Sequence, residues 1–255
     1  MTEAMIELKN LHVSVNRASS RELEILHGLN LKIMPQDFIT IIGTNGAGKS
    51  TLFNTIAGNL PVTSGEIYHR GQRVTRMSEE KRSSFIARVF QDPKLGTAPR
   101  MTVAENLLLA QKRGQRRTLH LRQLEKNLPA YQKLTALAGN GLEKRLQTAT
   151  AGLSGGQRQT LSFLMATIKK PDLLLLDEHT AALDPQSSQR LLKLTDQKIQ
   201  QDNLTALMIT HHLQDALRYG NRLLVLKNGK IEKDFKQEEK KVLRLGDLYQ
   251  FFASD

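Results

Sequence analysis

The chain contains no cysteine and no tryptophan, and aromatic residues make up only 5% of its 255 residues. Without cysteine there can be no disulfide and no thiolate-bound metal ion, which is compatible with a reducing compartment. Proteins that bind single-stranded nucleic acid stack bases on aromatic side chains placed among basic ones. The few aromatic residues here show no such interleaving, so the sequence offers no base-stacking surface.

Long apolar segments are also missing. The longest purely aliphatic run is the four leucines at 173–176, whereas a membrane-spanning helix needs about 20 consecutive apolar residues. Residues 1–10 carry acidic side chains and no apolar stretch, so we do not expect a signal peptide. An apolar fraction of 39% and a charged fraction of 24% are typical of a globular protein.

Positive charge is in excess. The chain has 37 Lys and Arg against 25 Asp and Glu, a formal net charge of +12. This balance fits nucleic acid, anionic lipid headgroups or a polyanionic small molecule as partner. The basic residues are scattered, with local groups at 112–117 and 240–244, so charge alone leaves the three partner classes open.

Hydrophobic periodicity predicts an α/β fold. Alternating short runs across residues 5–42 predict strands, and the apolar run 38–42 predicts a buried parallel strand. Hairpins are expected at 65–73 and around Asn228-Gly229, which is a strong type I′ turn signal. A mostly parallel sheet is predicted from the strand–helix–strand order of three later segments, 173–176, 186–201 and 205–210.

Residues 95–160 differ from this pattern and predict an inserted helical sub-domain. Thr102 and Glu105 have the spacing of a capping box, which opens a helix, and Leu-rich basic segments follow to about residue 138. Since no linker or repeat is visible, we expect a single domain over residues 1–255 that contains this insertion.

A glycine-rich motif follows the apolar run 38–42. It fits G-x-x-x-x-G-K-[ST] and is followed by Thr51; its residues are Gly43, Thr44, Asn45, Gly46, Ala47, Gly48, Lys49 and Ser50. The glycines permit a tight turn whose backbone N–H groups converge on phosphate oxygens, and the helix expected at 50–59 adds its positive dipole end. Lys49 would pair with the β- and γ-phosphates, and the Ser50 hydroxyl would coordinate Mg²⁺. A plain glycine-rich turn is disfavoured by the flanking strand and helix.

Two acids end the leucine run at 173–176. Asp177, at the end of a buried strand beside the phosphate loop, would help to hold Mg²⁺. Glu178 would polarise the attacking water as a general base. A pair of acids at a solvated strand end is the competing interpretation, which becomes the weaker one once the phosphate loop is taken into account.

A second potential anion site comprises Ser154, Gly155, Gly156 and Gln157, preceded by Leu153. A serine hydroxyl, glycine N–H groups and a helix start all favour an anion, although Ser-x-x-Gln is also a capping pattern. One chain does not need two separate phosphate sites for one triphosphate. Two chains arranged head to tail do, because each then completes the site of the other.

With this motif the sequence closely resembles the ATPases of ABC transporters over nearly its whole length. The resemblance implies a P-loop NTPase core, an antiparallel β sub-domain, ATP and Mg²⁺ as ligands, and a dimer. It also implies roles for three further residues: Gln91 touches Mg²⁺ and water, Asp184 communicates across the dimer, and His211 contacts the γ-phosphate, with His212 as a weaker candidate. The expected partners are a second ATPase subunit, an integral membrane permease and, indirectly, an extracytoplasmic substrate-binding protein, at the cytoplasmic face of the membrane.

Segments 91–99 and 177–185 are similar to a narrower group, the ATPases encoded with a substrate-binding lipoprotein and one permease for tryptophan, tyrosine or related amino acids. Two features depart from the wider family. No aromatic residue stands at Val15 or Asn16 to stack on adenine, so stacking is weak or comes from a neighbour such as His12. His179 and Ala181 replace a common Pro and Ser.

Three different functions remain open for the sequence. A soluble ABC ATPase acting on nucleic acid or ribosomes is favoured by the charge of +12, but such chains usually carry tandem ATPase domains or a long coiled-coil insertion. The second is an ATPase of a soluble enzyme complex, such as the phosphonate-cleaving lyase, and the third is an exporter ATPase. We expect an importer and no nucleic-acid partner.

Overall fold

The computed structural model describes residues 3–15, 22–115 and 123–252, which divide into two units. The first unit comprises residues 1–82 and 203–255, and the second comprises residues 83–202. Within the described ranges, no helix combines the length and apolar character that crossing a membrane requires. Two predicted features lie outside the described residues: Asn16, and residues 116–122 of the predicted helical insertion.

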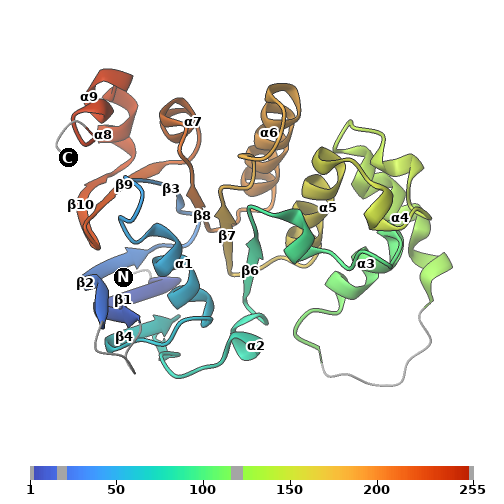
Figure 1. The fold of residues 1–255 in the computed structure, drawn as a ribbon. Helices are drawn as coiled ribbons and strands as arrows, with labels where there is room; N and C mark the ends of the chain where they lie inside the picture. The colour runs from blue at the N-terminus through green and yellow to red at the C-terminus, as the bar shows by residue number, and fades with distance from the viewer. Residues whose placement is uncertain (1–2, 16–21, 116–122, 253–255) are drawn as a thin grey trace. The chain divides into compact units, whose positions relative to one another are not determined.

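An antiparallel sheet forms the first part of the first unit (Figure 1). Its strands, in spatial order, are β2 (Leu23–Ile33), β1 (Ile6–Val15), β4 (Ser64–His69) and β5 (Gln72–Arg73). Ile6 and Leu8 on β1 are buried on either side of the half-buried Glu7, and they pair with Ile33 and Leu31 on β2. Strands are thus confirmed across residues 5–42, as two of 10 and 11 residues and a short third one.

The second set of strands in the first unit surrounds β3 (Phe38–Ile42), whose five residues are all buried. On either side of β3 run two parallel partners, β8 (Ala206–Ile209) and β9 (Arg222–Lys227), and β10 (Lys230–Phe235) is antiparallel to β9. The predicted buried parallel strand is confirmed. Since parallel strands end at the same edge, the glycine-rich loop after β3 and His211 after β8 emerge from one edge of this sheet.

Two-residue turns close both predicted hairpins. Arg70 and Gly71 join β4 to β5 with φ of 45° and 70°, and Asn228 and Gly229 join β9 to β10 with φ of 47° and 71°. Positive φ at both central residues is the geometry of a type I′ turn, which suits the twist of the flanking strands. The turn predicted at Asn228-Gly229 is therefore confirmed.

The helices of the first unit are α1 (Lys49–Ala57), α2 (Glu79–Arg82), α7 (Leu213–Arg218), α8 (Gln237–Val242) and α9 (Leu245–Tyr249). Arg82, which is 2% exposed, forms hydrogen bonds with the C-terminal end of α1. Its guanidinium donates to the carbonyls of Thr55 and Ile56 at 2.8 and 2.7 Å, and to that of Val74 at 2.8 Å. Burial lowers the pKa of Arg82. The bonds to Thr55 and Ile56 reach carbonyls of the last turn of α1, where the helix end leaves few intrahelical donors.

The second unit combines a parallel strand pair with helices. Its elements are β6 (Ile86–Val89), α3 (Val103–Gln111), α4 (Leu124–Ala136), α5 (Gly155–Thr167), β7 (Leu173–Asp177) and α6 (Pro185–Gln201), with short 3₁₀ turns at Pro93–Gly96, Leu142–Lys144 and Thr150–Gly152. Helix α3 packs against α4 and α5 (Figure 1). Its predicted capping box is confirmed, since the Glu105 N–H donates to Thr102 Oγ1 at 3.2 Å and the Thr102 N–H to Glu105 Oε2 at 2.9 Å. The strand predicted at 173–176 and the helix predicted at 186–201 are confirmed as β7 and α6.

Candidate functional site

The glycine-rich loop connects β3 to α1 in a conformation that requires glycine. Gly46 and Gly48 have φ of 82° and 97°, in the left-handed region. A Cβ atom at Gly43 would lie 2.1 Å from the carbonyl oxygen of Leu226, and one at Gly48 would lie 2.8 Å from Leu26 Cδ2. The loop therefore passes too close to β9 and β2 to carry larger residues at these two positions.

Lys49 begins α1 and its side chain folds back over the loop. Its ammonium donates to the carbonyls of Gly43 and Thr44 at 2.7 and 2.9 Å, and the residue is 6% exposed. The β9–β10 turn supports the loop from outside, because the Gly229 N–H donates to the Ala47 carbonyl at 3.1 Å. The loop is thus held by its own lysine and by a hairpin that is distant in sequence.

His211 and His212 follow β8 in the first unit, and both are exposed. The Thr210 N–H donates to the Ile41 carbonyl at 3.2 Å, which continues the β3–β8 pairing up to the base of the glycine-rich loop. His212 is the N-cap residue of α7, and its N–H donates to Thr210 Oγ1 at 3.1 Å. The two histidines therefore differ in local role: His212 starts a helix, and His211 lies at the strand end.

Asp177, Glu178 and Gln91 lie at one edge of the β6–β7 pair in the second unit. Val89 pairs with Leu176, so Gln91 and Glu178, each two residues further on, follow the two strands at the same level. Asp177 accepts a hydrogen bond from the Arg88 guanidinium at 2.6 Å. Glu178 has φ of 46°, a left-handed conformation that is uncommon outside glycine and marks a sharp turn of the backbone after β7.

The signature motif, residues 153–157, forms the start of α5. Ser154 is its N-cap: Ser154 Oγ accepts from the Gln157 N–H at 3.2 Å, and the Ser154 N–H donates to Gln157 Oε1 at 3.3 Å. The capping interpretation of Ser-x-x-Gln is thus confirmed as local structure. It does not exclude an anion site, because a hydroxyl that accepts one hydrogen bond still has its own proton to donate.

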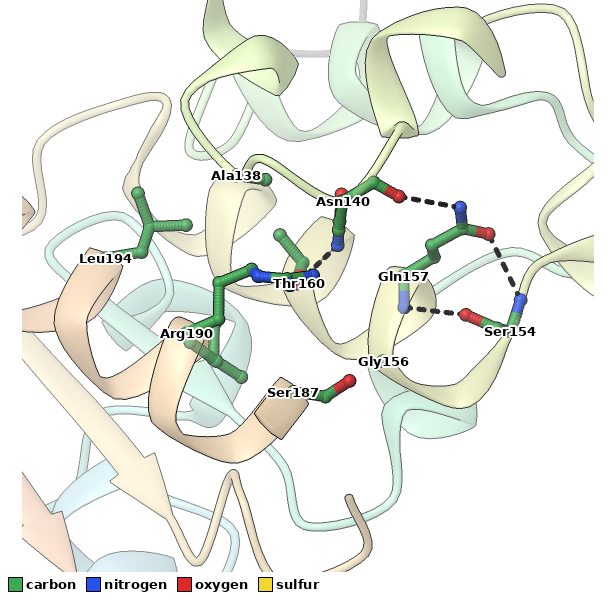
Figure 2. Close-up of a pocket in the computed structure, with 10 residues that line it drawn as sticks. Ala138, Asn140, Ser154, Gly156, Gln157, Thr160, Ser187, Arg190 and Leu194 are labelled. Atoms are coloured by element: carbon green, nitrogen blue, oxygen red, sulfur yellow. Dashed lines mark hydrogen bonds between the residues drawn. The ribbon is translucent and has the colours of Figure 1, made fainter. Parts of the chain in front are cut away.

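Asn140, in the loop that follows α4, also holds the signature motif, as Figure 2 shows. The Asn140 carbonyl accepts from Gln157 Nε2 at 3.1 Å, and Asn140 Nδ2 donates to Thr160 Oγ1 at 3.1 Å. Ser154, Gly156 and Asn140 line a pocket of about 140 Å³, together with residues of α6 that include Ser187 and Arg190. Among the described residues, a Cβ atom added at Gly155 would meet nothing within 4 Å. The first turn of α5 is accordingly open on that side.

Asp184 is the N-cap of α6, where its side chain accepts from the Ser187 N–H at 3.0 Å. Hydrogen bonds from Ser187 lower the pKa of this carboxyl group. The sequence contained this signal, since Asp followed by Pro185 is a helix start with proline at the first helical position. A capping role is compatible with the predicted role in dimer communication, which stays a prediction.

Comparison with known proteins identifies the family. The family profile described as "ABC transporter" matches residues 26–181, more than half of the chain. The chain belongs to the ABC transporter family. Its members are ATPases that bind and hydrolyse ATP, and the glycine-rich loop and the signature motif both fall within the matched residues.

Individual ABC proteins resemble the chain over most of its length. A tyrosine transport ATP-binding protein of Clostridioides difficile is 42% identical over 97% of this chain and 98% of its own. The spermidine/putrescine import ATP-binding protein PotA of Haemophilus ducreyi is 32% identical over 91% of this chain, and the match spans 58% of PotA. A dimeric ATP-binding cassette solved in a post-hydrolysis state with ADP and Pi has a TM-score of 0.77 at 27% identity and covers 91% of this chain. This likeness confirms the predicted fold class.

Two features of this ABC ATPase bear on its departures from the family. His12 Nδ1 lies 2.6 Å from Glu24 Oε1, and this hydrogen bond is the main reason that the pKa of Glu24 is lowered. His179 is 2% exposed, its Nε2 lies 3.2 Å from Thr195 Oγ1, and burial lowers its pKa to about 4. His12 thus has a polar partner on β2, and His179 is a neutral core residue at physiological pH.

Sequence reasoning missed two contacts at the candidate site. Arg88 pairs with Asp177, and the only signal was a charged residue within the apolar strand 86–89. Asn140 holds Gln157, and no sequence pattern pointed to it, because the contact joins residues 17 apart through a backbone carbonyl.

Proposed function

We propose that two copies of the chain bind two ATP molecules head to tail, each between the phosphate loop (residues 43–51) of one copy and the signature motif of the other. One observation carries this proposal. The chain has two glycine-rich helix starts, at α1 and α5, and both present backbone N–H groups suited to phosphate oxygens. A facing copy gives the second helix start a triphosphate to bind.

Within each site we assign the hydrolytic step to Glu178, which accepts a proton from the attacking water as general base. His211 contacts the γ-phosphate, and Gln91 orients the water. The positions of these residues at carboxyl ends of parallel strands support the assignment, because ligands of open α/β sheets bind at that edge. When ATP binds, the Lys49 ammonium would leave the loop carbonyls and pair with the β- and γ-phosphates.

The predicted metal ligands fit Mg²⁺ by their chemistry. Ser50 offers a hydroxyl, Asp177 a carboxylate and Gln91 an amide oxygen, and Mg²⁺ prefers oxygen ligands together with substrate phosphates. When bound, the cation would neutralise negative charge on the β- and γ-phosphates.

We assign the ATPase to an importer, at the cytoplasmic face of the membrane, with an integral membrane permease and an extracytoplasmic substrate-binding protein. The similarity to a tyrosine transport protein over nearly its full length supports an amino acid such as tyrosine or tryptophan as cargo, and the likeness to PotA supports import. A net charge of +12 suits a protein that lies against anionic lipid. Binding of ATP would close the dimer and hydrolysis would open it, which drives the permease between two states.

Two experiments test this function. The first replaces the general base: Glu178→Gln should lower phosphate release by about 100-fold or more while leaving ATP binding intact. The exposed Glu125→Gln on α4 is the matched control and should hydrolyse ATP normally. Hydrolysis by Glu178→Gln at the wild-type rate would show that the general base is another residue.

The second experiment tests the partners. The tagged chain, purified from its native membrane, should bring down a permease, and vesicles with the complete complex should take up tyrosine or tryptophan only when ATP is supplied. Recovery of RNA or of a soluble enzyme complex would contradict the assignment to a transporter, and ATP-driven efflux would contradict import.

A further inference from the structure

An arginine inside the second unit is bonded to the carboxylate that is assigned to Mg²⁺. The Arg88 Nη2 atom lies 2.6 Å from Asp177 Oδ2, and the two side chains are only 12% and 13% exposed. A charge-assisted hydrogen bond of this length is among the stronger interactions in proteins, and low exposure limits screening by solvent. The pair is therefore a fixed part of the β6–β7 edge.

The same guanidinium also reaches the segment that carries Gln91. Arg88 Cζ lies 4.8 Å from the ring centroid of Phe90, a cation–π distance. The Phe90 carbonyl in turn accepts from Gln159 Nε2 at 2.8 Å, and Gln159 is 1% exposed. One side chain thus contacts both Asp177 and the residue that precedes Gln91.

We propose that Arg88 is a positioning residue that sets Asp177 and Gln91 for nucleotide-bound Mg²⁺. The proposal rests on the function proposed above and adds a residue to the metal site. Arg88 holds Oδ2 of Asp177, which leaves Oδ1 for the cation or its water. Carboxylate ligands are commonly oriented by hydrogen bonds of this kind, and loss of such a partner typically costs 10- to 100-fold in metal affinity.

The charge of Arg88 has an opposing effect. The guanidinium is positive and repels a divalent cation, which would weaken metal binding. Because the guanidinium is held on Oδ2, it lies further from a cation at Oδ1 than the carboxylate itself does, so we expect orientation to exceed repulsion. The sign of the change in metal affinity when Arg88 is replaced distinguishes the two effects.

The test uses Mn²⁺ as a spectroscopic probe in a Glu178→Gln background that keeps ATP intact. Arg88→Met retains length and contact with Phe90 but removes the charge and the donors. It should weaken Mn²⁺ binding to the ATP-bound protein by about tenfold, measured by electron paramagnetic resonance. ATP binding in the presence of EDTA should not change, because a positioning role acts through the metal.

Two further variants complete the experiment. Arg88→Lys keeps the charge but lacks the planar fork, so it should fall between the parent and Arg88→Met, and it serves if the methionine variant does not fold. Arg100→Met removes an exposed arginine from the same unit and should leave Mn²⁺ affinity unchanged.

The Mn²⁺ measurements separate a failure of the Arg88 proposal from a failure of the proposed metal ligands. Unchanged Mn²⁺ affinity in the folded Arg88 variants would overturn the proposal, and tighter binding would show that Arg88 competes with the metal instead. Failure of the parent Glu178→Gln protein to bind Mn²⁺ with ATP would count against the proposed metal ligands themselves rather than against Arg88 alone.

Discussion

At the residue scale, the side chains of the candidate site are held by two kinds of contact. Close backbone approach excludes a Cβ atom at Gly43 and Gly48, because β9 and β2 lie against the loop there. Tertiary contacts hold Arg88 and Asn140, whose partners come from other elements. Loop spacing is visible in a single sequence, whereas side-chain pairs across strands and loops depend on tertiary register, so the sequence predicts the two glycines and not the two polar pairs.

Because His179 is buried in its neutral form, we expect the free energy of unfolding to fall in acid. Its pKa is about 4 in the folded protein and near 6.5 when unfolded, so the unfolded chain binds more protons between these values. Stability is complete above pH 6.5 and falls as the pH drops toward 4. From these two pKa values we expect His179 to account for roughly 2 kcal/mol of loss between pH 7 and pH 5.

Urea unfolding of the wild type and of His179→Gln at pH 7 and pH 5 measures this contribution. The variant cannot take up the proton, so the free energy of unfolding should change less with pH than in the wild type. Equal losses in the two proteins would show that His179 is not the group responsible.

At the scale of elements, β-strands with a strict burial pattern and helices with capping residues were predicted well. The strand 173–176, the capping box at Thr102 and the Asn228-Gly229 turn were all confirmed, because each is specified by neighbouring residues. The length of β1 and β2 was underestimated. Several register shifts interrupt their pairing, so the alternation in the sequence breaks where the strands continue.

The phosphate loop gives a prediction at this scale. Gly43→Ala places a methyl group 2.1 Å from the Leu226 carbonyl, so the loop must move away from β9. We expect ATP affinity to fall by at least tenfold, because the N–H groups no longer converge. Equilibrium binding of a fluorescent ATP analogue measures it.

Gly155→Ala is the matched control, since its Cβ meets no described atom within 4 Å and its N–H is retained. It should bind the analogue on its own phosphate loop as tightly as the wild type. Normal binding by Gly43→Ala would mean that the loop tolerates displacement and that its close contact with β9 is not required.

At the scale of the whole molecule, family membership follows from the match over residues 26–181, whereas the head-to-tail dimer remains a proposal. Two phosphate-binding helix starts and one triphosphate per chain favour a dimer on chemical grounds. The structure adds that Ser154 and Gln157 hold the first turn of α5 in a fixed geometry before any partner arrives. Such preorganisation lowers the entropic cost of association.

Sedimentation velocity of Glu178→Gln, with and without MgATP, tests the head-to-tail dimer most directly. We expect a monomer without nucleotide and a dimer with ATP. Adding Ser154→Arg should abolish the dimer while leaving ATP binding to the monomer intact, because the arginine blocks only the surface that faces the partner's ATP. A Glu178→Gln protein that stays monomeric in saturating MgATP, or a Ser154→Arg variant that dimerises equally well, would contradict the head-to-tail dimer.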